Sequence, residues 1–392
     1  MQIEQPSISI MLYLISCALQ DKTPDESKLD GIDIHKLFYI AKIHSLSSIV
    51  YLALQKTNIL EFTDPVIAKQ WKELKEKTLV KNILMDAERK QLLAELEDKH
   101  IWYMPLKGCV LKYLYPHEEM RELTDNDILY DGKYQKYVKD VFLSRGYTVI
   151  SYAEEYHDVY QKRPVYNYEM HTSLFTESEF PELYFAFKDI QEKLIPDSDS
   201  TYGRHLSNED FYIYITAHSY RHYIFAGTGL RTLVDFYVMG KSFCETMDWE
   251  YVSAQLQKIN LNDYEKICRS LAAHLFDTTE LIEVSSLPLE EQKFLAFFCS
   301  SGTYGTIENQ IINNLKKYGK DNTVIGKSTK LGYYFKRLFP GRDYYKERYP
   351  FLYKYYFFIP FFRLYRIIRR LIISKDKIYF EIKTILSYKE KK

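Results

Sequence analysis

Two aspartates separated by a single residue, Asp125 and Asp127, open the segment DNDILY, whose apolar residues favour a β-strand. Because alternate side chains of a strand point to the same face, the two carboxylates are expected to converge on one point. Neighbouring carboxylates repel each other unless solvent, a shared proton or a cation screens them, and their oxygens suit Mg²⁺ or Mn²⁺. The spacing alone is weak, since Asp197 and Asp199 repeat it in the polar segment IPDSDS, which we interpret as a solvated loop.

A third carboxylate lies on a later predicted strand, within the segment VYNYEMHTSLF. There, a period of two places Glu169 and His171 on one face and Met170 on the other. A two-metal site for phosphoryl transfer needs a carboxylate beyond the aspartate pair, and Glu169 is placed to supply it. The competing interpretation of Glu169 is an ordinary exposed glutamate of a strand.

Lys107 and Gly108 lie where the strand candidate IWYMPL gives way to the short helix candidate KGCVLKYLY. Backbone N–H groups at a helix start can face an anion, the lysine adds a charge, and a glycine lets a phosphate approach the backbone. Lysine–glycine pairs are also common in ordinary turns. The specific signal is the order: strand, Lys-Gly turn, helix, strand with two aspartates, and later strand with a glutamate.

The segments around these residues indicate which elements must position them. Apolar residues recur at spacings of three and four in residues 32–56 and 66–100 and again from Asn208, which predicts helices on both sides of the strands. Between them, YTVISY, HDVYQKR and VYNYEMHTSLF are strand candidates, and a helix closes at Gly146. We predict an α+β fold in four regions: an N-terminal helical region (1–99), an α/β core (100–200), a helical domain (201–310) and a basic aromatic tail (311–392).

The composition indicates a folded soluble protein, with 46% hydrophobic and 27% charged residues and an unusual 37 tyrosines and 23 phenylalanines. Five widely spaced cysteines form no C-x-x-C pair, which favours buried reduced thiols. The N-terminal segment has an apolar run but neither a basic start nor a cleavage site, so we interpret it as a core helix. These features predict a cytoplasmic protein. His35 and His44 lie alone on predicted helices and are interpreted as packing residues.

The tail differs from the rest of the chain in charge, because residues 316–392 hold 21 Lys and Arg against 6 Asp and Glu. Its longest charge-free run, 355–362, has eight residues, whereas a membrane-spanning helix needs roughly 20. The arginines of residues 363–370 suggest instead a peripheral contact with an anionic membrane surface. The alternatives are helices packed on the protein with solvated basic faces, or a contact with nucleic acid.

The ordered elements resemble the uncharacterised nucleotidyltransferase family of the polymerase-β-like superfamily. In that family a Leu-Lys-Gly turn, a short helix ending in Tyr-Pro, an arginine and an Asp-x-Asp strand follow one another. The matching positions here are Leu106, Lys107, Gly108, Tyr115, Pro116, Arg121, Asp125 and Asp127. The family continues with an acidic residue two before a histidine on a later strand, then a helix with histidines, an arginine and an aspartate. Those positions are Glu169, His171, His218, His222, Arg231 and Asp235.

The resemblance implies metal-dependent transfer of a nucleoside monophosphate from a nucleoside triphosphate to a hydroxyl acceptor, with release of pyrophosphate. It also implies a small mixed-sheet nucleotidyltransferase core flanked by N-terminal helices and a C-terminal helical domain. The implied catalytic and metal-binding residues, with Mg²⁺ or Mn²⁺ as cofactor, are Asp125, Asp127 and Glu169. The implied nucleotide-binding residues are Lys107, Gly108, Cys109 and Arg121, and the candidate substrate contacts are His171, His218, His222 and Arg231. The acceptor stays open among sugar, peptide, protein and RNA.

Two positions depart from the family's pattern. Wider members of the superfamily have Gly or Ser after the turn glycine, where this chain has Cys109. An apolar residue is usual between the aspartates, where this chain has Asn126, whose side chain should point away from the metals. Arg121 can either reach a phosphate or hold the aspartate loop. The alternative function is a catalytically silent, nucleotidyltransferase-like protein that serves in binding or assembly, docked on a membrane by its tail.

Overall fold

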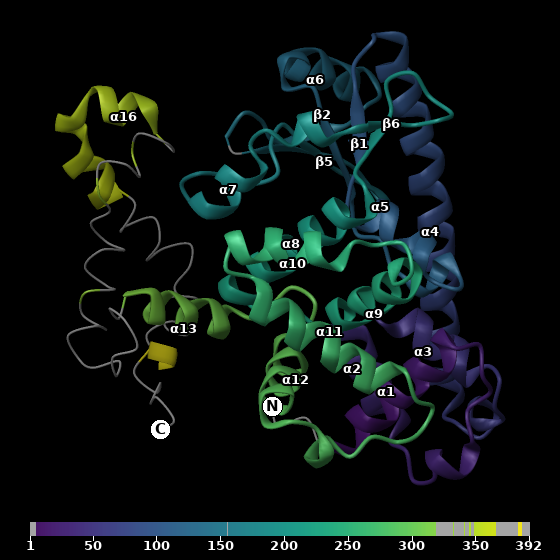
Figure 1. Cartoon of the computed structure of the whole chain (residues 1–392). Coiled ribbons are helices and arrows are strands. Elements are labelled where there is room, and N and C mark those ends of the chain that lie inside the picture. The colour runs from purple at the N-terminus through teal and green to yellow at the C-terminus, as the bar shows by residue number, and fades with distance from the viewer. Residues whose placement is uncertain are drawn as a thin grey trace. The chain divides into compact units, whose positions relative to one another are not determined.

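The structure contains a five-stranded mixed sheet (Figure 1). The computed structural model describes residues 5–154, 156–318, 332, 341, 345, 349–365 and 383–385. The strands of this sheet are β1 (Tyr103–Pro105), β2 (Asn126–Tyr130), β3 (Thr148–Ser151), β4 (His157–Lys162) and β5 (Tyr166–His171). Their order is β1-β2-β5-β4-β3, with β2 and β5 parallel and each other neighbouring pair antiparallel. The predicted α+β fold class is confirmed.

One face of the sheet carries the core and packs against two helices. These are α4 (Pro65–Asp98) and α6 (Gln135–Ser144), and Figure 1 shows both beside the strands. The buried side chains that meet there are Leu92 and Leu96 from α4, Val138, Val141 and Phe142 from α6, and Ile128, Tyr130, Tyr160, Tyr168 and Met170 from the strands. Because alternate strand residues point to opposite faces, Asp127 and Glu169 must lie on the other face.

Helix α4 begins at Pro65, where the Asp64 side chain accepts a hydrogen bond from the Val66 N–H and caps the first turn. Its surface is mostly charged, and its buried positions recur at spacings of three and four. They are Trp71, Thr78, Asn82, Met85, Arg89, Leu92 and Leu96. Besides Thr78, the stripe contains two larger polar residues, Asn82 and Arg89, whose side chains must find buried partners.

The remaining helices lie within the predicted helical segments, except α7 (Pro181–Phe187), for which no helix was predicted. Before the sheet lie α1 (Gln5–Leu19), α2 (Ile34–Ile43) and α3 (Ser47–Leu54), and after it α7, α8 (Asn208–Phe225), α9 (Arg231–Phe243), α10 (Trp249–Lys258), α11 (Asn262–Phe276) and α12 (Leu289–Ser301). Helix α1 is buried along much of its length, which confirms the predicted core helix. Asp197 and Asp199 lie in the loop between β6 (Ile195–Pro196) and β7 (Arg204–His205), as predicted.

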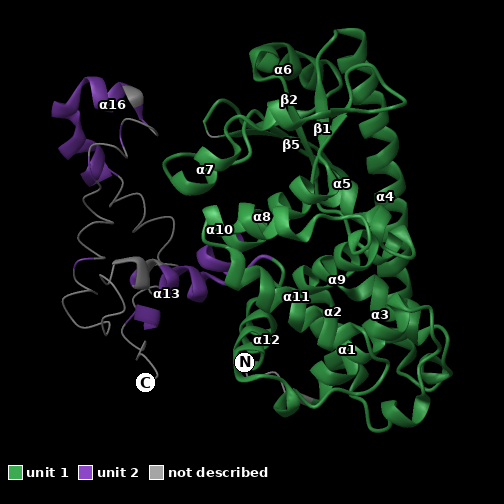
Figure 2. Ribbon diagram, in the orientation of Figure 1, with its two compact units in different colours: residues 1–221, 229–303 green, residues 222–228, 304–392 purple. Residues whose placement is uncertain are grey.

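The chain divides into two compact units (Figure 2). The first comprises residues 1–221 and 229–303 and holds the whole five-stranded sheet. The second comprises 222–228 and 304–392 and includes α13 (Ile307–Tyr318) and α16 (Pro350–Lys354). The predicted boundaries at residues 99, 200 and 310 stay a prediction.

Most of the basic tail, including residues 366–382, lies outside the described residues. Within the part of the chain that the structure describes, none of the helices combines the length and apolar character that a membrane crossing needs.

The five cysteines are free thiols, as predicted, but their burial varies. Cys17, Cys109 and Cys268 are buried, whereas Cys244 is exposed, so the prediction of buried thiols is wrong at that position. Cys244 follows the last residue of α9, where the chain turns toward α10 at the surface.

His44 is buried, and its Nδ1 accepts a hydrogen bond from the Leu230 N–H at 3.2 Å. Its interpretation as a packing residue is confirmed.

Candidate active site

The parallel pairing of β2 with β5 places Asp127 directly beside Glu169. Two residues further along each strand, the same pairing sets Leu129 beside His171. His171 Nε2 lies 3.8 Å from Glu169 Oε2, which confirms that these two side chains share a face. The register of two neighbouring strands thus brings residues from separate parts of the sequence to one point.

Helix α4 holds the segment that leads into the aspartates. The Asn82 side chain donates to the Arg121 carbonyl at 3.2 Å and accepts from the Leu123 N–H at 3.3 Å. Arg89 donates to Asn126 Oδ1 at 2.7 Å. Asn126 therefore points toward α4 and away from the carboxylates, as predicted, and the two larger polar residues of the buried stripe are satisfied.

Lys107 precedes the short helix α5 (Gly108–Leu111) with a φ of +49°, a backbone conformation that residues with a Cβ rarely adopt. Its Nζ lies 2.7 Å from Asp127 Oδ1 and 3.7 Å from Glu169 Oε2. Burial lowers the pKa of Lys107, but the nearby anionic groups, Asp127 first, outweigh it and hold that pKa well above its ordinary value. A strained backbone conformation persists only where surrounding contacts favour it, and the ion pair of Lys107 with Asp127 is such a contact.

His171 orients the Asp127 carboxylate. Its side chain is 1% exposed, and its Nε2 lies 2.8 Å from Asp127 Oδ1. Burial, assisted by the Lys107 charge, lowers the pKa of His171 to about 3, so the imidazole is neutral. Because a carboxylate only accepts hydrogen bonds, the single ring proton belongs on Nε2. His171 Nδ1 is then a buried acceptor with no hydrogen-bond partner among the described residues.

The three carboxylates differ in charge because their surroundings differ. Burial raises the pKa of Glu169 to about 8, and the nearby Asp127 charge adds to the rise. Burial and Asp127 likewise raise the pKa of Asp125 to about 6. Burial also acts on Asp127, but Lys107 and the hydrogen bond from His171 hold its pKa below the ordinary range. Asp127 is thus the permanent anion of the site, and its neighbours are crowded carboxylates that a cation would stabilise.

The donor set fits a divalent metal ion. Asp127, Glu169 and His171 each offer one ligand atom, and these atoms all lie within 4.8 Å of one another. The carboxylate oxygens of Asp127 and Glu169 are ligands that suit both Mg²⁺ and Mn²⁺. Asp125 precedes the first residue of β2 and is not part of this group. With its proton on Nε2, His171 donates to Asp127, so the two carboxylates are the ligands that remain in this group. The predicted role of Asp125 as a ligand stays a prediction.

Arg121, predicted to bind the nucleotide or hold the aspartate loop, is engaged with a helix of the following region. Its Nε and Nη2 donate to the two carboxylate oxygens of Asp235 on α9, at 2.8 Å and 3.0 Å. The Tyr115 hydroxyl donates to the same carboxylate at 2.7 Å. These contacts anchor the segment before Asp125, and a nucleotide contact by Arg121 stays a prediction.

Gly108 and Cys109 serve the packing of the turn. A Cβ on Gly108 would lie 2.7 Å from Arg121 Nη1, so the glycine makes room for the Arg121 guanidinium. The Cys109 Sγ lies 3.4 Å from Asn126 Oδ1, on the side away from the carboxylates. Burial raises the pKa of Cys109 to about 11, which leaves a neutral thiol. A nucleotide contact by either residue stays a prediction and would be made by backbone atoms.

The other predicted substrate contacts, His218, Arg231 and His222, are not part of the group of Asp127, Glu169 and His171. The His218 ring packs 6.1 Å from the Tyr214 ring. Arg231 donates to the Glu122 carbonyl at 3.3 Å, and its charge lowers the pKa of Asp125, partly offsetting burial. His222 belongs to the second compact unit.

Three residues near the carboxylates were missed by the sequence analysis: Tyr156, Tyr214 and Arg221. The Tyr156 ring lies 5.6 Å from the His171 ring, and the Arg221 guanidinium donates to the Tyr156 hydroxyl. The buried Tyr214 lies near enough to Lys107 for the Lys107 charge to offset part of the burial effect on the Tyr214 pKa. A signal was present, since Tyr214, His218 and Arg221 are spaced by four and three and share one face of α8.

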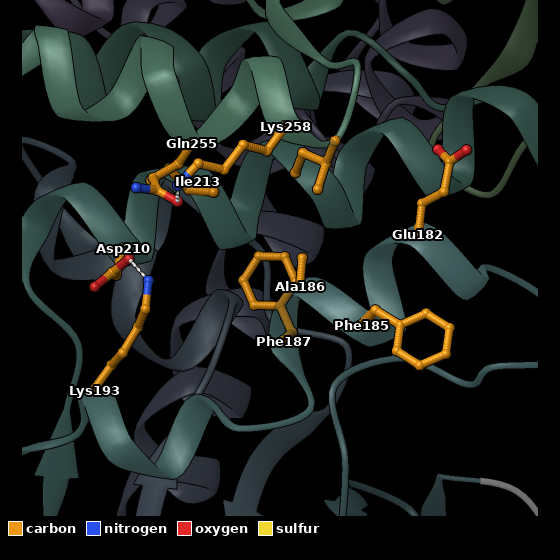
Figure 3. Close-up of a pocket in the computed structure, with 10 residues that line it drawn as sticks. Glu182, Phe185, Ala186, Phe187, Lys193, Asp210, Ile213, Gln255 and Lys258 are labelled. Atoms are coloured by element: carbon orange, nitrogen blue, oxygen red, sulfur yellow. Dashed lines mark hydrogen bonds and ion pairs between the residues drawn. The ribbon is translucent and has the colours of Figure 1, made fainter.

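A separate pocket of about 360 Å³ lies among α7, α8 and α10 (Figure 3). Phe187 and Ile213 contribute apolar walls, and Lys193 pairs with Asp210 at 2.7 Å on its rim. None of the predicted site residues lines it. Phe187 packs against Tyr214, with 6.1 Å between the ring centroids.

A mixed sheet with apposed carboxylates beside a Lys-Gly turn is the arrangement expected of a nucleotidyltransferase. The sequence model of the family described as "Uncharacterised nucleotidyltransferase" matches residues 30–277. The chain belongs to this family. No curated protein and no solved structure matches the chain.

Proposed function

We propose that this protein transfers a nucleoside monophosphate from a nucleoside triphosphate to a hydroxyl acceptor. The observation that carries the proposal is the register of β2 and β5, which sets Asp127 beside Glu169 with Lys107 2.7 Å from Asp127 Oδ1. Membership of a nucleotidyltransferase family supports it. The acceptor class, whether sugar, peptide, protein or RNA, is left to experiment.

Asp125, Asp127 and Glu169 would hold Mg²⁺ or Mn²⁺, and His171 would orient the Asp127 carboxylate. When bound, the metal would offset charge on the phosphates and lower the pKa of the acceptor hydroxyl. In the structure, Lys107 is the counter-charge of Asp127 and Glu169. Once a bound metal ion has taken over that role, Lys107 would be free to pair with a phosphate oxygen.

The reaction makes one bond and breaks one. The acceptor oxygen bonds to the α-phosphorus, while the bond from that phosphorus to the oxygen shared with the β-phosphate breaks. The bonding electrons leave with pyrophosphate, and the hydroxyl proton passes to solvent. The protein's part is to align the two oxygens and to balance charge, which carboxylates held in place by the sheet do well because they need no reorganisation.

The test follows label from nucleoside triphosphates carrying it on either the α- or the γ-phosphate. Each of the four common ribonucleotides is incubated with Mg²⁺ or Mn²⁺ and with pools of RNA, protein and small molecules. We expect label in an acceptor only from the α-labelled nucleotide, and none with Asp127→Asn. Asp199→Asn is the matched control, because it alters an aspartate of the same spacing in an exposed loop.

The alternative, a silent member of the fold that binds a partner, predicts no transfer by the wild type. Transfer that is lost in Asp127→Asn excludes it, whereas unaltered transfer in that variant refutes the proposed site.

For the tail, exposed aromatic side chains at Phe351, Tyr356, Phe357 and Phe361 support the proposal of a peripheral membrane contact. Flotation of the full chain with vesicles of neutral lipid, with and without phosphatidylserine, tests it. Recovery that is equal with both vesicles would contradict an anionic surface. The cytoplasmic location remains a prediction.

A further inference from the structure

Arg221 presents a positive charge at the edge of the site and faces a neutral partner. Its Nη1 donates to the Tyr156 hydroxyl, and its guanidinium carbon lies 5.2 Å from the centre of the Tyr156 ring. Burial raises the pKa of Tyr156 even though Arg221 acts against it, so that hydroxyl stays protonated at neutral pH. The contact orients the guanidinium without cancelling its charge.

Among the described residues, no carboxylate lies within 4 Å of the Arg221 guanidinium. Burial acts to lower the pKa of Arg221, whereas Tyr156 and then the charge of the exposed residue Glu179 raise it. Two other basic residues of this region are paired with carboxylates, Lys107 with Asp127 and Arg121 with Asp235, and Arg231 donates to the Glu122 carbonyl. A partly buried guanidinium without a counter-charge is costly unless an anionic ligand supplies one.

Tyr156 connects this charge to the carboxylates. Its ring lies 5.6 Å from the ring of His171, which itself contacts Asp127, and 4.5 Å from the ring of His157. Two aromatic rings, those of Tyr156 and His171, therefore link Arg221 to Asp127. A ligand seated on the carboxylates with a chain of phosphates can extend to Arg221.

We propose that Arg221 binds the terminal phosphates of the nucleoside triphosphate, the part that departs as pyrophosphate. This inference rests on the proposed function and adds the residue that distinguishes a triphosphate from a monophosphate. The planar guanidinium matches two phosphate oxygens, and it balances the charge that gathers on the leaving group. Tyr156 is a positioning residue, whose hydroxyl and ring hold the guanidinium in place.

The test measures dissociation constants by calorimetry on the full chain with Mg²⁺, using the four nucleoside triphosphates and the corresponding monophosphates. Arg221→Gln should weaken binding of the preferred triphosphate by about 10- to 100-fold and change monophosphate binding by less than about twofold. Arg221→Lys keeps the charge but not the planar pair of donors, so its triphosphate affinity should lie between those of the wild type and Arg221→Gln. Arg163→Gln is the matched control, because it removes an exposed arginine.

The outcomes separate this inference from the proposed function. If the wild type binds none of the triphosphates, or Asp127→Asn binds them equally well, the proposed function fails. If Asp127→Asn loses binding and Arg221→Gln does not, only the role of Arg221 is refuted. Equal losses for tri- and monophosphate also refute it, since they indicate a general structural effect. The unfolding midpoint of each variant, followed by tryptophan fluorescence, shows whether it is folded.

Discussion

Replacing Asp235 by asparagine is expected to destabilise the sheet-containing unit by about 3–5 kcal/mol. Arg121 makes two charge-assisted hydrogen bonds to this carboxylate, at 2.8 Å and 3.0 Å, and Tyr115 makes a third, at 2.7 Å. Arg121 is 6% exposed and Asp235 is 8% exposed, so water cannot replace the lost charge. Asparagine keeps the shape of the side chain and leaves a buried guanidinium without a counter-charge.

Removing both charges together should cost less than removing one. In the double variant Arg121→Met with Asp235→Leu, no buried charge remains, and apolar contacts replace the pair. The remaining loss is the acceptor of the Tyr115 hydroxyl, which costs about 1–3 kcal/mol. Together with the single variants Arg121→Met and Asp235→Leu, the double variant gives the coupling energy between the two side chains.

Urea unfolding followed by tryptophan fluorescence is a suitable assay. All three tryptophans, Trp71, Trp102 and Trp249, lie in the first compact unit, so the signal reports on the unit that contains the pair. A loss below about 1 kcal/mol in Asp235→Asn would show that the pair does not anchor the aspartate segment. The same variants decide the role of Arg121: if it contacts a phosphate, the folded double variant loses triphosphate affinity, whereas a purely structural arginine leaves it unchanged.

Three further predictions concern the turn and a buried histidine. The Lys107→Met variant should bind Mn²⁺ at least about tenfold more tightly than the wild type in the absence of nucleotide, because the Lys107 ammonium competes with the ion for Asp127. Electron paramagnetic resonance measures the Mn²⁺ affinity, and an unchanged affinity would contradict the prediction. Gly108→Ala should lower the free energy of unfolding in urea by about 1–3 kcal/mol, because the added Cβ would lie 2.7 Å from Nη1 of the Arg121 guanidinium, which the Asp235 carboxylate holds in place. A free energy of unfolding equal to that of the wild type would show that the turn can shift to admit the Cβ. Burial lowers the pKa of His44 from 6.5 to about 4 in the folded protein. As the pH falls below 6.5, His44 is protonated in the unfolded chain but not in the folded one, so the free energy of unfolding decreases by about 2 kcal/mol by pH 5. Urea unfolding at pH 7 and pH 5 measures that loss, and an equal loss in His44→Gln would assign it to other groups.

Local pattern in the sequence was enough to place the elements that bear the site. Strand periodicity predicted that Glu169 and His171 share a face and that Asn126 points away from the carboxylates, and the structure confirms both. The turn at Lys107 was also predicted from its neighbours, as a strand passing into a short helix. Such features depend on residues close in sequence, because backbone hydrogen bonding and side-chain alternation act over a few residues.

Contacts between distant segments came only with the tertiary structure. Arg121 and Asp235 are 114 positions apart, and nothing in the local pattern of either shows that one will neutralise the other. Tyr156 and Arg221, 65 positions apart, were not selected, because the helical spacing of Arg221 with Tyr214 and His218 does not show that Arg221 meets Tyr156.

The sequence by itself determined the order of turn, helix and strands and the face on which Asp127 and Glu169 lie. Tertiary structure decided which partners those side chains meet: Lys107 and His171 on Asp127, Arg121 on Asp235, and Arg221 on Tyr156. The physical reason is that alternation along a strand is a local property of the backbone, whereas charge pairing depends on how separate elements pack, and packing is set by the whole core.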